Sequence, residues 1–184
     1  MNKVAVFPLL ALFGICGLGV TGIVFGDDDK YEYRGWWGGA RQDVAPVDNP
    51  VYREECGSCH FAYQPGLLPS KSWQGLMAGL ENHFEDNAEL DAGVHDEISR
   101  YLEANAADRS STRRSSGFAS NSGSLRISDS RYFRRQHHEI PTRWVENNPK
   151  VGSFASCDAC HTTAEQGNYD EHGVRIPGIG RWED

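Results

Sequence analysis

The chain has 184 residues, of which 39% are hydrophobic, and its formal net charge is −8 at pH 7. An acidic chain without a basic stripe interleaved with aromatic residues is not expected to bind nucleic acid. The apolar side chains are too few for two separate hydrophobic cores, so a further source of apolar surface is needed.

Residues 1–26 have the pattern of an export signal. Lys3 is followed by an uncharged stretch over residues 4–25, which Asp27–Asp29 end abruptly. This polarity leaves the N-terminus inside and carries the remainder of the chain out of the cytoplasm. Small residues ending at Gly26 permit cleavage, whereas the stretch approaches the roughly 20 residues that span a bilayer. The segment is predicted to be a cleaved signal or an N-terminal anchor that holds the protein at a membrane.

Residues 27–50 are predicted to be an extended lead-in. The segment begins with acidic residues, passes through a Gly-rich patch at 34–39 and ends among Pro46, Asn49 and Pro50. Glycine, proline and asparagine in this density discourage regular structure.

A Cys-x-x-Cys-His motif occurs twice, at residues 56–60 and 157–161. Such a motif is the covalent attachment signature of c-type haem, because two cysteines three residues apart lie on one side of a helical turn and the next histidine reaches the iron. The sequence therefore predicts two c-type haems. The predicted attachment residues are Cys56, Cys59, Cys157 and Cys160, and the predicted proximal iron ligands are His60 and His161.

Zinc and disulfides are the alternatives for these cysteines. Zinc ribbons place their cysteine pairs about 15–20 residues apart, much closer than Cys56 and Cys157. Outside the motifs only Cys16 remains, and it lies in the apolar N-terminal stretch. Haem also supplies what the composition lacks, because burying each large apolar macrocycle replaces missing core side chains.

Helical periodicity follows the first motif, in a predicted first haem-binding segment at residues 51–107. Apolar residues between Trp73 and Phe84 recur at helical spacing and form one stripe, which includes Met77 and His83. The expected N-cap is a serine just after Pro69, either Ser70 or Ser72. A second helix is predicted to begin at Asp91 and to bury apolar residues at helical spacing, namely Val94, Ile98, Tyr101 and Leu102.

The remainder of the chain divides into a linker and a second haem-binding segment. Residues 108–124 are Ser-rich and nearly free of apolar side chains, which predicts a flexible linker. Within residues 125–184, a helix beginning near Ser128 or Ser130 places His137 on an apolar side. No segment shows the alternation of apolar and polar residues that is typical of a strand. The predicted fold class is therefore all-α, with two haem-binding segments and long irregular loops.

The sixth ligand of each iron decides what a haem does. A second strong ligand leaves no place for substrate or oxygen, which suits electron transfer. Met77 is the only methionine outside the export segment, so at most one haem has a His/Met ligand pair. The histidines available beside the proximal ones are His83, His95, His137, His138 and His172.

Two of these histidines are predicted to be distal ligands. His83 is assigned to the first iron, because an unpaired imidazole on an apolar stripe is costly to bury; Met77 on the same stripe is its rival. His137 is assigned to the second iron, and its competitor His138 is rotated about 100° away on the helix. His95 is assigned to the surface, and His172, in a loop, ranks third for the second iron after His137 and His138.

The chain resembles a known family, the dihaem cytochromes c of the DHC type. The resemblance rests on residues 49–69, which include the first motif, and on shorter blocks at 72–73, 80–84, 126–128, 132–137 and 157–164. It implies a periplasmic electron carrier with two bis-histidine haems, with His83 and His137 at the distal positions. It also implies redox exchange with a membrane b-type cytochrome or another c-type cytochrome. The chain departs from the family pattern in His138 and in its Ser-rich insert.

The sequence therefore predicts an electron carrier rather than an enzyme, with no catalytic residue. An electron enters at one haem, passes to the other and leaves to a redox partner. The alternatives are a dihaem peroxidase, which needs one open iron site, and a haem-based redox or gas sensor, which needs a ligand that leaves. The excess of histidines and the lack of a recognisable catalytic cluster disfavour both.

Overall fold

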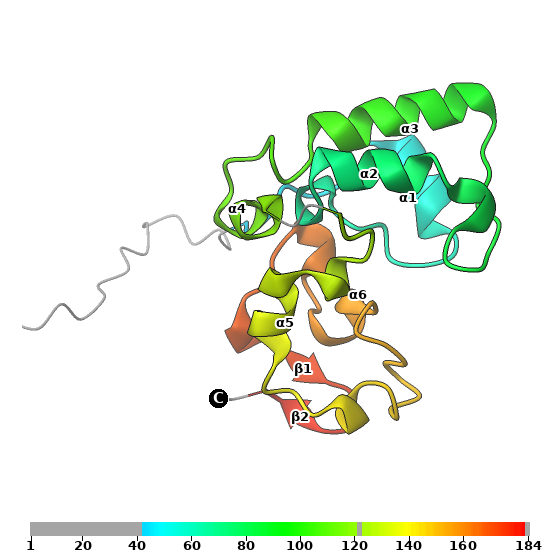
Figure 1. Ribbon diagram of the computed structural model, residues 1–184. Helices are drawn as coiled ribbons and strands as arrows, with labels where there is room; N and C mark the ends of the chain where they lie inside the picture. Colours follow the sequence, from blue (N-terminus) through cyan, green and yellow to red (C-terminus); the bar gives the residue numbers. More distant parts are fainter. Residues whose placement is uncertain (1–41, 121–122, 183–184) are drawn as a thin grey trace, which may run out of the picture. The chain divides into compact units, whose positions relative to one another are not determined.

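The computed structural model describes residues 42–120 and 123–182, which belong to one compact unit. The predicted export segment and most of the lead-in lie outside the described residues. The described part of the lead-in, before α1, has no helix or strand. Six α-helices and one two-stranded sheet are found in the described ranges, joined by short 3-10 turns and irregular connections (Figure 1). The predicted all-α class is confirmed.

The first half of the structure is built on three helices: α1 (Pro50–Gly57), α2 (Ser70–Met77) and α3 (Ala92–Ala104). Helix α1 begins where the Asn49 side chain accepts a hydrogen bond of 2.7 Å from the Tyr52 backbone N–H, and proline at its first position suits a helix start. Helices α2 and α3 lie side by side (Figure 1). Their facing sides form a first core cluster around Trp73, Leu76, Ile98 and Leu102.

Helix α2 is shorter than its apolar stripe predicts. It ends at Met77, and the chain continues through a 3-10 turn at Leu80–Asn82 into a tight turn at residues 83–86. The prediction that His83 lies on a helical stripe is therefore wrong. Gly79 directly follows the C-cap of α2, and glycine destabilises a helix interior by about 1 kcal/mol relative to alanine.

The N-terminus of α2 is capped from a distant part of the chain rather than by its own serines. Ser70 donates to Asp108 twice, from its backbone N–H and from its hydroxyl, each at 2.7 Å. Helix α3 begins after Asp91, as predicted.

Helix α4 (Arg113–Ala119) lies inside the segment that was expected to be a flexible linker. Its Ser115 and Phe118 side chains are buried. Ser115 packs against Gly66, where any Cβ atom would collide with the serine hydroxyl. Polar residues thus form a helix here because a small hydroxyl and one aromatic ring fit against the preceding half of the chain. The division into two haem-binding segments stays a prediction.

The second half holds α5 (Arg131–His137), α6 (Cys157–Cys160) and a small antiparallel sheet. Helix α5 begins after Ser130, whose hydroxyl accepts a hydrogen bond of 3.0 Å from the Phe133 N–H, in agreement with the sequence prediction. Strand β1 (Arg175–Ile176) pairs with β2 (Gly180–Arg181). The remaining 3-10 turns are Pro65–Leu67, Ile127–Asp129, Thr142–Trp144, Ala164–Gln166 and Glu171–Gly173.

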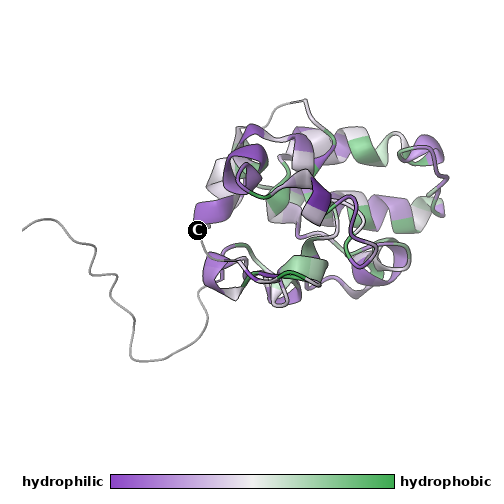
Figure 2. Cartoon of the chain, turned by 90° about the horizontal axis from the view of Figure 1, so that it is seen from below, coloured by the Kyte–Doolittle hydropathy of each residue, from purple (hydrophilic) through white to green (hydrophobic). Residues whose placement is uncertain are grey.

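A second core cluster draws on both halves of the chain. Its buried members are Val44, Leu67, Ala107, Phe118, Phe133, Ala164 and Tyr169. The two clusters share the partly buried Tyr63 and Ile127 at their edges. Most helices carry both hydrophobic and hydrophilic bands, as expected of helices with one buried side (Figure 2). Within the described ranges, no helix combines the length and the hydropathy needed to cross a membrane.

Candidate haem-binding sites

The first motif lies at the end of α1. Cys56 stands on its last turn, Gly57 ends the helix, and Cys59 and His60 follow outside it. The Cys56 thiol is free and partly buried. Burial, followed by the nearby Glu55 and Cys59, raises the pKa of Cys56 to about 11. The site therefore favours a neutral sulfur over a thiolate, and the sulfur of a thioether to haem is neutral.

His60 and His83 face each other, with ring centroids 6.2 Å apart and ring planes at 21°. The Nδ1 atom of His60 lies 2.7 Å from the Phe61 carbonyl oxygen. A histidine that donates from Nδ1 to a carbonyl keeps Nε2 unprotonated, which is the state that binds a metal.

The separation within the pair fits two ligands of one metal. An imidazole nitrogen bonds a first-row metal at about 2.0 Å, and the centre of a five-membered ring lies about 1.1 Å behind that nitrogen, given C–N bonds near 1.33 Å. Two rings bound across one metal therefore have centroids about 6 Å apart.

A tight turn presents His83 to this site. The His83 N–H donates to the Asp86 carbonyl at 2.7 Å, and the Asp86 N–H donates back at 3.2 Å. The two residues between them, Phe84 and Glu85, both have positive φ angles, of 55° and 83°. Arg126 lies over the Phe84 ring, 3.9 Å from its centroid, so a residue of the second half supports the turn.

The second motif lies on α6, which carries Cys157 and Cys160 on one turn. His161 follows, and its ring centroid is 6.2 Å from that of His137, at the end of α5, with ring planes at 76°. The Nδ1 atom of His137 lies 2.9 Å from the Phe133 carbonyl oxygen, and the Phe133 ring stacks on the His137 imidazole at 3.8 Å.

Burial keeps the groups of the second site uncharged. It raises the pKa of Cys157 to about 12, with help from Asp158. It lowers the pKa of His161 to about 4, and the charges of His137 and Arg114 add to this shift. The pKa of His137 is lowered too, chiefly by burial. Neutral imidazoles are the form that ligates iron.

The residues present fit a haem at both places. Each site combines two facing imidazoles with two thiols, and among the described residues the buried Nδ1 atoms of His83 and His161 have no hydrogen-bond partner. In the described part of the chain, no three His, Cys, Asp or Glu side chains gather to hold a single metal ion. A structural zinc site needs four such ligands.

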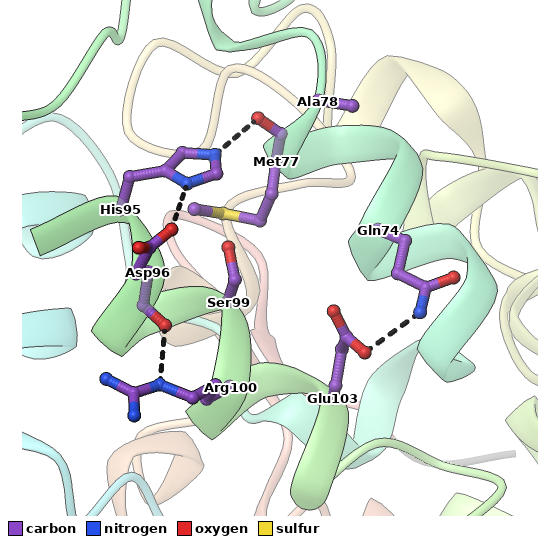
Figure 3. A pocket seen from close by; sticks show the side chains of 8 residues that line it. All are labelled: Gln74, Met77, Ala78, His95, Asp96, Ser99, Arg100 and Glu103. Carbon is purple, nitrogen blue, oxygen red and sulfur yellow. Dashed lines mark hydrogen bonds and ion pairs between the residues drawn. The ribbon is translucent and has the colours of Figure 1, made fainter. Parts of the chain in front are cut away.

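The remaining candidates lie elsewhere. His138 is exposed, and its imidazole lies 3.7 Å from the Glu139 carboxylate. His172 is exposed in a 3-10 turn. His95 is half-buried rather than a free surface residue: its Nε2 atom lies 3.0 Å from the Met77 carbonyl at the end of α2. The Met77 side chain is buried and lines a groove between α2 and α3 beside His95 (Figure 3), whereas His83 is the side chain that faces His60.

Two neighbouring residues after the first motif connect the sites. Tyr63 packs against His60, with centroids 5.0 Å apart, and its hydroxyl donates to the Ala155 carbonyl at 2.8 Å, just before the second motif. The fully buried Gln64 donates to the Ala164 carbonyl and accepts from the Tyr169 hydroxyl, each at 2.5 Å. Both residues lie in the block at 49–69 that carries the family resemblance, but the sequence does not indicate their contacts with the second motif.

Comparison with known proteins identifies relatives of this chain. Residues 52–169 match the dihaem cytochrome c family. The solved structure of a dihaem cytochrome c from Shewanella baltica OS155 is 46% identical in sequence, with a TM-score of 0.63, and the match covers 73% of this chain and 98% of that one. A dihaem cytochrome c from Rhodobacter sphaeroides is 43% identical, with a TM-score of 0.61, over 68% of this chain and 100% of that one. No curated protein sequence matches the chain.

Proposed function

Because the chain belongs to the dihaem cytochrome c family and carries two c-type haems, we propose that it is an electron carrier, not an enzyme. The observation that carries this proposal is the pair of facing imidazoles at each site, 6.2 Å apart in both cases. Iron with two strong axial ligands has no open position for substrate or oxygen, and it exchanges electrons without changing its ligands.

The chain's own residues would hold the cofactors. Cys56 and Cys59 attach the first haem and Cys157 and Cys160 the second, in the roles that the sequence predicts. His60 with His83, and His161 with His137, would be the ligand pairs, because the rings of each pair face each other with centroids 6.2 Å apart. The haem supplies the one-electron iron couple when bound. The protein would supply the imidazole ligands, the covalent tether and, at the second site, a largely buried surrounding; ligands and burial are among the properties that set a haem potential.

The proposed setting is the periplasm, and the proposed partners are redox proteins. The pattern of residues 1–26 supports export, with either a cleaved signal or a retained anchor. The family resemblance supports exchange with a membrane b-type cytochrome or another c-type cytochrome. The acidic net charge of −8 favours a partner with a basic docking surface.

The proposal is tested by challenging both irons with external ligands. Carbon monoxide is added to the reduced protein and peroxide to the oxidised protein, and the Soret band is followed. An electron carrier with closed coordination shows no rapid shift and no peroxide turnover. A His83→Ala variant, which opens the first iron, serves as the positive control for carbon monoxide binding. Fast binding or turnover by the natural protein would reject the carrier in favour of a sensor or a peroxidase.

A further inference from the structure

A charged residue of α4 lies beside the second haem site although it belongs to neither motif. Arg114 forms an ion pair with Asp43, with 3.1 Å between its Nη2 atom and the carboxylate. The same Nη2 donates to the Tyr169 carbonyl at 3.0 Å. Both charged side chains are about four-fifths buried, at 22% and 21% exposure, so water screens them weakly.

Tyr169 links this ion pair to the iron ligands. Its ring lies 5.2 Å from that of His161, and its backbone N–H donates to Asp43 at 2.8 Å. Arg114 is therefore bound to the backbone of the residue whose ring packs on the His161 imidazole.

The hydrogen bonding of Arg114 is incomplete. Its Nε atom is buried and has no partner in the described part of the chain. A buried donor left without an acceptor costs about 1–3 kcal/mol. A haem carries carboxylate groups on its edge, so the cofactor itself is a chemically suitable source of the missing acceptor.

We propose that Arg114 is the fixed positive charge of the second haem site and raises the reduction potential of that haem. The inference rests on the proposed function, because it concerns how electrons are distributed between the two haems. The oxidised iron carries one more positive charge than the reduced iron, so a nearby cation favours reduction. Asp43 holds the guanidinium in place and offsets part of its charge. Arg114 belongs to the Ser-rich segment at residues 108–124, so this segment would set the reduction potential of the second haem as well as connect the two halves.

The test compares three arginine variants of the full holoprotein by redox titration of both haems. Arg114→Gln is expected to lower the equilibrium constant for reduction of the second haem about tenfold, which is about 59 mV for a one-electron couple. Arg114→Lys keeps the charge and is expected to retain most of the potential. Arg113→Gln removes an exposed charge from the same helix and is expected to leave both potentials unchanged.

The two haems are distinguished by low-temperature EPR during the titration. The His83→Met variant identifies the first haem, because it alters the ligands of that iron only. The inference is wrong if Arg114→Gln shifts the second potential no more than Arg113→Gln does, or if Arg114→Lys shifts it as far as Arg114→Gln, which would indicate a packing role. In both cases the proposed function still holds if the protein titrates reversibly and does not bind carbon monoxide.

Discussion

At the scale of single residues, the two imidazole pairs share a separation but differ in orientation. The ring planes cross at 21° in the first pair and at 76° in the second. In ferric low-spin haem, near-parallel imidazoles split the two d orbitals with which they overlap, whereas near-perpendicular imidazoles leave these orbitals almost equal in energy. The two haems should therefore have different electronic ground states.

This difference predicts two distinct EPR signals from the oxidised protein. The first haem is expected to give a rhombic spectrum with three resolved g values, and the second a strongly anisotropic spectrum dominated by one low-field line. The measurement is continuous-wave EPR at liquid-helium temperature, with the first signal assigned through its change in His83→Met. Two superimposable signals of one type would show that the ring orientations are not as described.

Neighbouring histidines provide a second test. His137→Ala is expected to convert the second haem to a high-spin form, because this imidazole faces His161. His138→Ala, the adjacent control, is expected to be silent, because its side chain is 68% exposed and lies beside Glu139. Visible absorption and resonance Raman spectra report the spin state. High-spin iron in His138→Ala together with an unchanged His137→Ala would reverse the assignment.

At the residue level, the sequence gives the sharpest prediction where one helix carries the information. His137 is separable from His138 because their angular difference on α5 follows from helix geometry. His83 is selected because a buried imidazole needs a partner, although the helical stripe assumed for it does not exist. Arg114 and Gln64 escape prediction, because their partners lie 55 to 105 residues away along the chain and no periodicity connects such positions.

At the scale of secondary-structure elements, Asp108 acts as the cap of α2. Burial alone would raise the pKa of its carboxyl, but hydrogen bonds from the Ser70 backbone and hydroxyl outweigh this effect and hold the pKa below its usual value. Asp108→Ala is expected to lower the free energy of unfolding by about 1 kcal/mol, as other lost caps do. Urea unfolding at pH 7 measures the loss. Asp91→Ala is the control, because Asp91 precedes α3 without a side-chain capping bond.

The same carboxylate gives a pH dependence with a definite sign. Its pKa is lower in the folded state than in the unfolded state, where it is about 3.9. Its contribution is therefore complete above that unfolded value and is lost as the pH falls through the folded pKa. In Asp108→Ala this part of the acid destabilisation is expected to be missing, so the natural protein and the variant should converge in stability at low pH. A constant gap between them down to acid pH would contradict the assignment.

The turn that presents His83 predicts a stabilising change. Glu85 has a φ angle of 83°, which disfavours any residue with a Cβ atom by about 1–2 kcal/mol. Glu85→Gly relieves this strain at a smaller entropic cost, so the free energy of unfolding should rise by about 0.5–1 kcal/mol. Glu81→Gly, an exposed position nearby without a positive φ, should lower it. Thermal unfolding of both variants measures these changes. A lower free energy of unfolding in both variants would mean that the turn is not strained at Glu85.

Element-level prediction succeeds for the starts of α3, after Asp91, and of α5, after Ser130, where apolar spacing resumes directly after a residue type that favours helix starts. It fails for α4, whose stability comes from the fit of Ser115 against Gly66 rather than from an apolar stripe. Prediction from the sequence makes α2 too long, because the apolar spacing continues beyond Gly79, whereas the helix itself ends at Met77. Turns with positive φ angles at Phe84 and Glu85 contradict ordinary turn preferences and have no sequence signal.

At the scale of the whole molecule, Gln64 joins the segment after the first motif to the segment after the second motif. It is fully buried, and both of its polar groups are hydrogen-bonded to residues after the second motif. Gln64→Leu leaves the Ala164 carbonyl and the Tyr169 hydroxyl without these partners, so the free energy of unfolding should fall by about 2 kcal/mol. Gln74→Leu is the control, because the Gln74 side chain is exposed and donates to Glu103 at the surface.

The same arrangement predicts one cooperative unfolding event. Chemical unfolding of the natural protein, followed by Soret absorbance and by far-ultraviolet circular dichroism, is expected to give coincident curves. Gln64→Leu should move both curves together to lower denaturant. Separate transitions for the two haems would show that the halves are independent domains.

The crossing contacts of Tyr63 and Gln64 also bear on how the protein is made. The partners of these two side chains lie 92 to 105 residues further along the chain. Truncation of the chain before residue 155 would remove the partners of both side chains. Two self-sufficient one-haem halves are therefore not expected, and the second centre can be completed only after residues 155–169 have been synthesised.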